Sequence, residues 1–148
     1  MGSSQLSSDN LLLRTFVFYG AILLLKMLAM AFFTAIARMR NRAFANPEDA
    51  AGLGLKVTAH EDVERVRRAH LNDMENIYVF LILGLFYVLT KPKIWWATML
   101  FRVFTGARIL HTIVYLNGVR QPARALCYLV GQLVNIYMAV TVVLRFMD

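Results

Sequence analysis

Polar and charged side chains crowd the stretch from Val63 to Asn76, directly before the uncharged apolar run from Ile77 to Leu89. Arg68, Asn72 and Glu75 are spaced by four and three residues, so a helix would align them along one face. Charges at membrane depth are costly and require partners, which makes a functional site the leading interpretation of this segment. We expect Asn72 and Glu75 to face inward, because a lipid-facing carboxylate would be expensive.

Two later apolar segments carry polar residues with the same helical spacing. Arg108, His111 and Tyr115 form one stripe, and Arg124 and Tyr128 are four residues apart on the last segment. Together with the preceding group they make a cationic set that contains one carboxylate. Such a set suits an anionic ligand that also has an amino group, since arginine pairs with carboxylates and a carboxylate pairs with an ammonium.

Simpler interpretations of the same residues stay open. A position at headgroup depth would account for Arg67, Arg68 and His70, and a role as a membrane anchor would account for Arg124. A binding site explains all of them together, because three helices would each contribute a polar face. The sequence alone therefore predicts a site without excluding these alternatives.

Other kinds of site find less support in the sequence. No spacing of His, Cys and carboxylates typical of a metal site occurs, and the arginines would repel a cation, so no metal is expected. Cys127 has no sequence neighbour that would make it a nucleophile and is interpreted as a small buried side chain. Lys26, alone in the first apolar span, is interpreted as an internal partner of Asp73 that neutralises two buried charges at once.

The elements that would position these residues are membrane helices. The chain has 148 residues, of which 59% are hydrophobic, and its mean hydropathy is positive. A helix of roughly 20 apolar residues crosses a bilayer. The sequence predicts an all-α integral membrane four-helix bundle, formed by one domain over residues 1–148. The spans are expected at about residues 11–37, 69–89, 94–116 and 123–146, with residues 38–68 as a loop that contains a short helix.

The distribution of lysine and arginine predicts the orientation. Most of the basic residues near the spans lie in the loop over residues 38–68 and just before the last span, so these connections should face the cytosol. Both termini should then lie outside or in a lumen. The basic residues sit at the ends of spans rather than on one continuous face, so the net charge of +7 is attributed to the lipid bilayer and no nucleic-acid partner is expected.

Four motifs follow one another in this chain, within a region that extends from Lys26 to about Gly131. They are FANPED from Phe44, VERVRRAHLNDMEN from Val63, GARILHTIVYL from Gly106 and QPARAL from Gln121. In this order they resemble the MAPEG family of membrane-associated proteins in eicosanoid and glutathione metabolism. The resemblance implies a four-helix subunit, a homotrimer, and glutathione as a cosubstrate bound between neighbouring subunits near the cytosolic face. Carried over by position, the glutathione contacts would be Arg38, Arg68, Asn72, Glu75, Arg108, His111, Tyr115, Arg124 and Tyr128.

Two branches of the family are close to this sequence. In the branch of prostaglandin H to E isomerases a serine follows the arginine that matches Arg124, whereas this chain has Ala125; its QPARAL run resembles the transferase branch. The transferases have a reactive cysteine beside the PED motif, and this chain has Ala50 in its place. Asp49 is shared with the isomerases, so the resemblance implies a supporting or isomerase-like role for Asp49. The leukotriene C4 synthase branch has a glutamine in place of His70 and a shorter first loop.

The resemblance therefore implies a trimeric, membrane-bound glutathione transferase that conjugates the glutathione thiolate to hydrophobic electrophiles, with glutathione-dependent reduction of lipid hydroperoxides as an additional activity. Arg124 is the expected catalytic residue, because a cation beside the sulfur favours the reactive thiolate. The alternatives are a glutathione-dependent prostaglandin H to E isomerase and a non-catalytic lipid-binding membrane scaffold. The expected location is the endoplasmic reticulum membrane, crossed several times, with the mitochondrial outer membrane as a second location.

Overall fold

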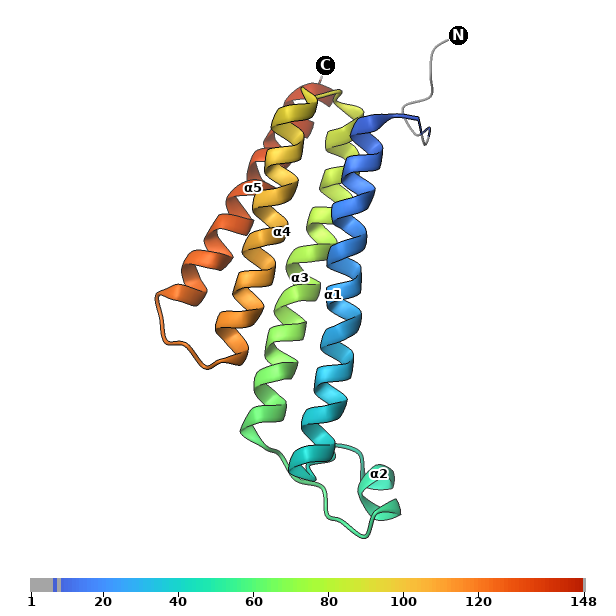
Figure 1. Ribbon diagram of the computed structural model, residues 1–148, viewed down its shortest axis with the longest axis vertical. Coiled ribbons are helices and arrows are strands. Elements are labelled where there is room, and N and C mark those ends of the chain that lie inside the picture. The colour runs from blue at the N-terminus through green and yellow to red at the C-terminus, as the bar shows by residue number, and fades with distance from the viewer. Residues whose placement is uncertain (1–6, 8, 148) are drawn as a thin grey trace.

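The computed structural model describes residue 7 and residues 9–147, and its regular structure is helical throughout these residues. The expected domain ends, residues 1–6, 8 and 148, lie outside the described residues. Figure 1 shows an up-and-down bundle in which the start of the first helix and the end of the last lie at the same end. The helices are α1 (Leu11–Asn41), α2 (Pro47–Gly52), α3 (Glu61–Leu89), α4 (Ile94–Leu116) and α5 (Ala123–Phe146).

Two helix boundaries differ from those predicted by hydropathy. α1 continues to Asn41 rather than ending near residue 37, and α3 begins at Glu61 rather than near residue 69. The first turn of α3 carries Glu61, Asp62 and Glu64, which favour a helix N-terminus through the helix dipole. These polar turns are helical without being apolar, so hydropathy does not detect them. As a result, α1 and α3 extend beyond α4 and α5 toward α2 (Figure 1).

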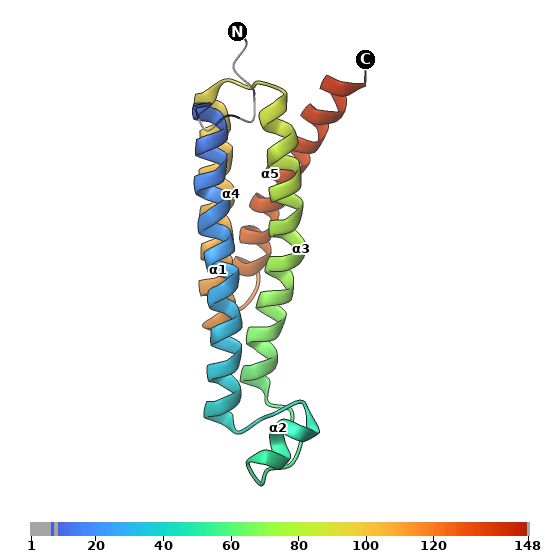
Figure 2. The ribbon, with the colours of Figure 1, turned by 90° about the vertical axis from the view of Figure 1, so that its right-hand side faces the viewer.

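The helices α3 and α4 form the centre of the bundle. α1 packs on both of them, and α5 also packs on both, whereas the described residues include no contact between α1 and α5. Figure 2 shows α5 inclined to the other three long helices. The core is aromatic: Phe80 of α3 stacks on Phe104 of α4 with ring centroids 4.1 Å apart, and Phe16 of α1 packs against Phe80 and Phe101. This core fixes α1, α3 and α4 relative to one another.

The outer faces of the long helices are apolar. Large exposed side chains include Phe32 on α1, Ile82 on α3, Ile113 on α4 and Leu133 on α5. All four long helices are long and apolar enough to cross a membrane. Exposed apolar surface on every long helix is suited to contact with lipid tails or with other membrane helices. The protein is therefore a multi-pass membrane protein.

Gly84 marks a close approach between α3 and α1. A methyl group added at Gly84 would lie 2.4 Å from Cε2 of Phe16, whose ring is held between Phe80 and Phe101. We predict that Gly84→Ala lowers the free energy of unfolding by about 1 to 3 kcal/mol, because the ring or the helix must move. Gly106→Ala is the matched control, since an added methyl there meets no described atom within 4 Å. Thermal unfolding in detergent compares them, and equal midpoints would contradict the close approach.

Candidate functional site

A buried polar network joins α1, α3 and α4. Nη2 of Arg108 donates to Oδ1 of Asp73 at 2.6 Å and to Oδ1 of Asn72 at 2.8 Å. Lys26 forms an ion pair with Oδ2 of Asp73, and the hydroxyl of Thr112 donates to the same oxygen at 3.3 Å. The side chains of Asp73 and Arg108 are completely buried. The predicted pairing of Lys26 with Asp73 is thus confirmed, and the same carboxylate also holds Arg108.

A cavity of about 370 Å³ opens beside this network, where α3, α4 and the start of α5 come together. Five of the side chains predicted to bind the ligand line it, although they come from three helices. Because the α4–α5 connection reverses the chain at this end, the last turns of α4 and the first turns of α5 face the same space. The lining residues are Asn72, His111, Tyr115, Gln121, Arg124, Ala125 and Tyr128.

Aromatic contacts hold the cationic group of this cavity. Cζ of Arg124 lies 4.8 Å from the ring centroid of Tyr115, and the ring of His111 lies 5.5 Å from that of Tyr115. A cation over a ring face is attracted by the ring while its N–H groups stay available at the edge. The hydroxyl of Tyr128 accepts a hydrogen bond from Gln132 at 2.8 Å, so its own hydrogen can be donated to a ligand.

Several buried nitrogens around this cavity have no hydrogen-bond partner among the described residues. They are Nε of Arg124, Nδ1 of His111, and both Nε and Nη1 of Arg108. Buried polar atoms in native proteins are nearly always paired. Guanidinium nitrogens are donors only, so the partner of the arginines must supply acceptor atoms, and their charge favours an anion.

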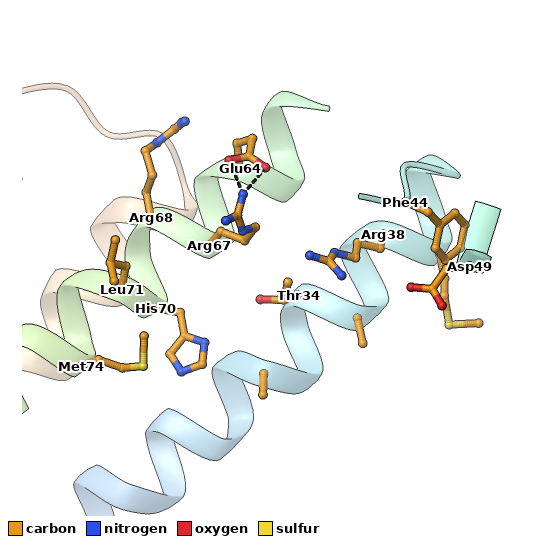
Figure 3. A pocket seen from close by; sticks show the side chains of 13 residues that line it. Thr34, Arg38, Phe44, Asp49, Glu64, Arg67, Arg68, His70, Leu71 and Met74 are labelled. Atoms are coloured by element: carbon orange, nitrogen blue, oxygen red, sulfur yellow. Dashed lines mark hydrogen bonds and ion pairs between the residues drawn. The ribbon is translucent and has the colours of Figure 1, made fainter. Parts of the chain in front are cut away.

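A second cavity, of about 800 Å³, lies between α1, α3 and the α2 segment (Figure 3). Arg38 and Asp49 line it, and Nε of Arg38 is buried without a partner among the described residues. Figure 3 shows Arg38 and His70 reaching into the space between α1 and α3. Beside them Arg67 donates to both oxygens of Glu64 at 2.8 Å. The apolar lining of this cavity consists of Ala31, Ala35, Met39, Phe44, Leu71 and Met74.

Arg68 and Glu75 do not line the smaller cavity. The guanidinium of Arg68 is directed away from α1 (Figure 3), donates to Glu61 at 2.7 Å, and also lies close to Tyr115. Glu75 is exposed, which corrects the expectation that it faces inward. The spacing places Glu75 on the face of Asn72 only approximately, and no described helix of the same subunit covers the side of α3 on which Glu75 lies.

Arg108 was expected to contact the ligand, but the structure places it behind the smaller cavity. It lines neither of the two cavities described above, but its guanidinium binds Asn72, which lines the smaller one. A methyl group added at Gly131 of α5 would lie 3.7 Å from Cδ of Arg108. Gly131 therefore packs against the Arg108 side chain at ordinary contact distance, and Asp73 binds the charge of Arg108 inside the bundle.

Comparison with known proteins agrees with this arrangement of helices and polar residues. The sequence profile of the MAPEG family matches residues 16–144, which is most of the chain. The chain belongs to the MAPEG family. The motifs that carried the resemblance in the sequence contribute to both cavities of this MAPEG protein.

The relatives of this MAPEG protein include two kinds of enzyme. A microsomal glutathione S-transferase 1 from Mus musculus is 50% identical over 137 residues, covering 88% of each chain. The protein of that name from Homo sapiens is 46% identical with the same coverage. A prostaglandin E synthase from Equus caballus is 46% identical over 134 residues, covering 88% of this chain and 87% of that protein. Overall identity therefore separates the transferases from the prostaglandin E synthase only slightly, and any distinction between the two rests on individual cavity residues.

Two residues of this MAPEG protein were not predicted from the sequence. Gln121 lines the smaller cavity, and its Oε1 accepts a hydrogen bond from the backbone nitrogen of Ala125 at 3.2 Å. The free backbone N–H groups in the first turn of a helix were an available signal that a polar side chain just before Pro122 would accept a hydrogen bond there. Thr112 lies four residues after Arg108, so its position on the same helix face could have connected it to Asp73.

Proposed function

We propose that this MAPEG protein is a membrane-bound glutathione transferase that conjugates the glutathione thiolate to hydrophobic electrophiles and also reduces lipid hydroperoxides with glutathione. The observation that carries the proposal is the cavity in which Arg124, held over Tyr115, has a buried nitrogen without a partner among the described residues. The relatives named microsomal glutathione S-transferase 1 support it. Glutathione suits the donors of this cavity, because it offers two carboxylates and an ionisable thiol, while its ammonium group would reach Glu75 on the exposed side of α3.

Arg124 is the proposed catalytic residue. Free glutathione is a weak nucleophile at neutral pH because its thiol, rather than the thiolate, predominates. A guanidinium beside the sulfur favours the thiolate, and lowering the thiol pKa by about 2 units corresponds to roughly 2.7 kcal/mol. The thiolate then attacks an electrophilic carbon, the new C–S bond takes the sulfur electron pair, and the leaving group departs with its own bonding pair. Asn72, Tyr115 and Tyr128 are proposed to hold the peptide.

A homotrimer is part of the proposal. Arg38 lines the larger cavity and Arg124 lines the smaller one. Glu75 is exposed on α3. If α1 of one subunit lay against α3 and α5 of the next, one glutathione molecule could contact all three side chains. Asp49, which lines the same cavity as Arg38, would then lie near the bound thiol in a supporting role.

The proposed location is the endoplasmic reticulum membrane, with the mitochondrial outer membrane second and the α2 end of the bundle in the cytosol. The printed names of the relatives include the word microsomal, which supports the first location. The end of α1 carries Arg38 and Arg40, and Arg42 follows directly, so positive charge is concentrated at this end.

The second candidate is a glutathione-dependent prostaglandin H to E isomerase. The similarity to a prostaglandin E synthase and the position of Asp49 in the larger cavity favour it. Ala125 weighs against it, because this residue lines the smaller cavity and offers no hydroxyl to a ligand thiol. A non-catalytic scaffold would have no use for buried arginine donors that face a cavity.

The experiment that tests the proposal combines binding with a substrate panel. Glutathione is titrated into the purified protein in detergent by calorimetry, and activity is measured with 1-chloro-2,4-dinitrobenzene, a lipid hydroperoxide and prostaglandin H. We expect saturable binding and turnover of the first two substrates. Folded protein that binds no glutathione would overturn the proposal, and isomerisation of prostaglandin H as the fastest reaction would replace it with the second candidate.

Glu75 provides a direct test of the ligand set. We predict that Glu75→Gln weakens glutathione binding by about 1 to 3 kcal/mol, because a charge-assisted contact with the ligand ammonium is lost. Calorimetry measures the change. Glu48→Gln is the matched control, since Glu48 is an exposed carboxylate on α2 that lines neither cavity. Unchanged affinity in a folded Glu75→Gln protein would remove Glu75 from the site.

A further inference from the structure

The buried network of Lys26, Asp73 and Arg108 contains two cationic side chains and one carboxylate. Asp73 and Arg108 are completely buried, and the side chain of Lys26 is 11% exposed. In the part of the chain that the structure describes, neither cation forms an ion pair with any other carboxylate. With Lys26 and Arg108 both protonated, the network has one excess positive charge. Since uncompensated charge inside a membrane protein is costly, an anion bound nearby would be stabilised by this charge.

The excess charge lies next to the smaller cavity without lining it. Arg108 binds Asn72 through the same nitrogen that binds Asp73, and Asn72 lines the cavity. His111 lines it as well and lies within electrostatic range of the network. The interior has a low effective dielectric constant, so a charge located behind the wall still acts on a ligand in front of it. The charged side chains in range of His111 are Lys26 from α1, Asp73 from α3, Arg108 from α4 and Arg124 from α5.

We propose that Lys26 is a positioning residue of the glutathione site: by sharing Asp73 with Arg108, it leaves a net positive charge behind the cavity that favours the thiolate of bound glutathione. This inference rests on the proposed function. Without Lys26, Asp73 and Arg108 would form a neutral pair, and the field in the cavity would fall. Lys26 does not line the smaller cavity, so its influence on the sulfur passes through Asp73 and Arg108.

Lys26→Gln separates the charge from the hydrogen bond. Glutamine can still donate to Asp73, but it carries no charge. With glutathione bound, we expect the pH at which the thiolate absorbance develops to rise by about 0.5 to 1 pH unit, because one nearby positive charge is lost. At neutral pH kcat should fall about 3- to 10-fold, in line with the smaller thiolate fraction. KM for the electrophile should not change. Lys26→Met gives the same test should Lys26→Gln fail to fold.

Two further variants distinguish charge from geometry. Lys26→Arg preserves the charge, so it should titrate like the parent protein. Thr112→Val removes a hydrogen bond to the same oxygen of Asp73 without changing any charge, so it should lower the thermal midpoint and leave the thiolate titration in place. An equal rise of the titration in Thr112→Val would overturn the inference, because a merely structural disturbance would then explain the effect.

The remaining outcomes are also distinct. A folded Lys26→Gln or Lys26→Met protein that binds glutathione and titrates at the parent pH would overturn the role of Lys26 while leaving the proposed function intact. A parent protein that binds no glutathione would instead overturn the proposed function on which the inference rests.

Discussion

Replacing Arg124 by alanine should lower the rate of glutathione conjugation by about 10²- to 10³-fold while weakening glutathione binding much less. The guanidinium is held over Tyr115 at 4.8 Å, so its position does not depend on the ligand. A preorganised cation contributes most where negative charge is concentrated, on the thiolate and in the transition state that follows from it. The thiolate absorbance should therefore develop at a pH higher by about 1 to 2 units in Arg124→Ala.

Two controls make the Arg124 prediction specific. Arg124→Lys should recover only part of the rate, because an ammonium lacks the planar fork of the guanidinium. Arg120→Ala removes an exposed arginine of the α4–α5 connection that does not line the cavity, and it should conjugate at the parent rate. An Arg124→Ala protein with normal glutathione affinity, an unchanged thiolate titration and the parent rate would leave Arg124 as a membrane anchor only.

Helical spacing predicted which polar residues share a helix face, but it could not predict which neighbour each face would meet. Asn72 and Arg124 reach the same cavity as the spacing suggested. Arg108 of α4 is instead paired with Asp73 of α3 inside the bundle. Since this pair depends on the packing of two different helices, the pattern of a single helix contains no information about it.

The prediction for Glu75 had a different difficulty. The cost of a lipid-facing carboxylate predicts that Glu75 faces inward, yet its side chain is exposed in this chain. In the proposed trimer the physical argument would still apply, because a neighbouring subunit would cover a face that the chain itself leaves open. A sequence pattern distinguishes buried from lipid-facing positions, but it does not distinguish burial within a subunit from burial between subunits.

The four membrane helices were predictable because their apolar runs exceed the thickness of a bilayer. The last turns of α1 and the first turns of α3 were not, since they are polar helices outside the apolar runs. These turns line the larger cavity together with His70. The missed part of the fold therefore coincides with part of the candidate site, as is common where function rather than hydropathy sets the composition.

The largest effect on stability is expected for Asp73→Ala, which should lower the free energy of unfolding by about 3 to 5 kcal/mol. Removal of the carboxylate leaves the buried cations Lys26 and Arg108 without their ion-pair partner, and the desolvation cost of an unpaired buried charge is then no longer offset. Asp62→Ala is the matched control, because Asp62 is an exposed carboxylate in the first turn of the same helix. Thermal or denaturant unfolding in detergent measures both variants.

A double variant tests whether unpaired charge is the cause. Adding Lys26→Met to Asp73→Ala removes one of the two stranded cations, so the double variant should be more stable than Asp73→Ala alone, although Lys26→Met by itself removes an ion pair. A higher free energy of unfolding in the double variant than in Asp73→Ala would show that the two sites are coupled. Loss of packing cannot produce this gain, since each substitution also removes side-chain volume. If the two losses simply add, Asp73 stabilises the bundle by packing and hydrogen bonding, and the charge balance of the network has no part in it.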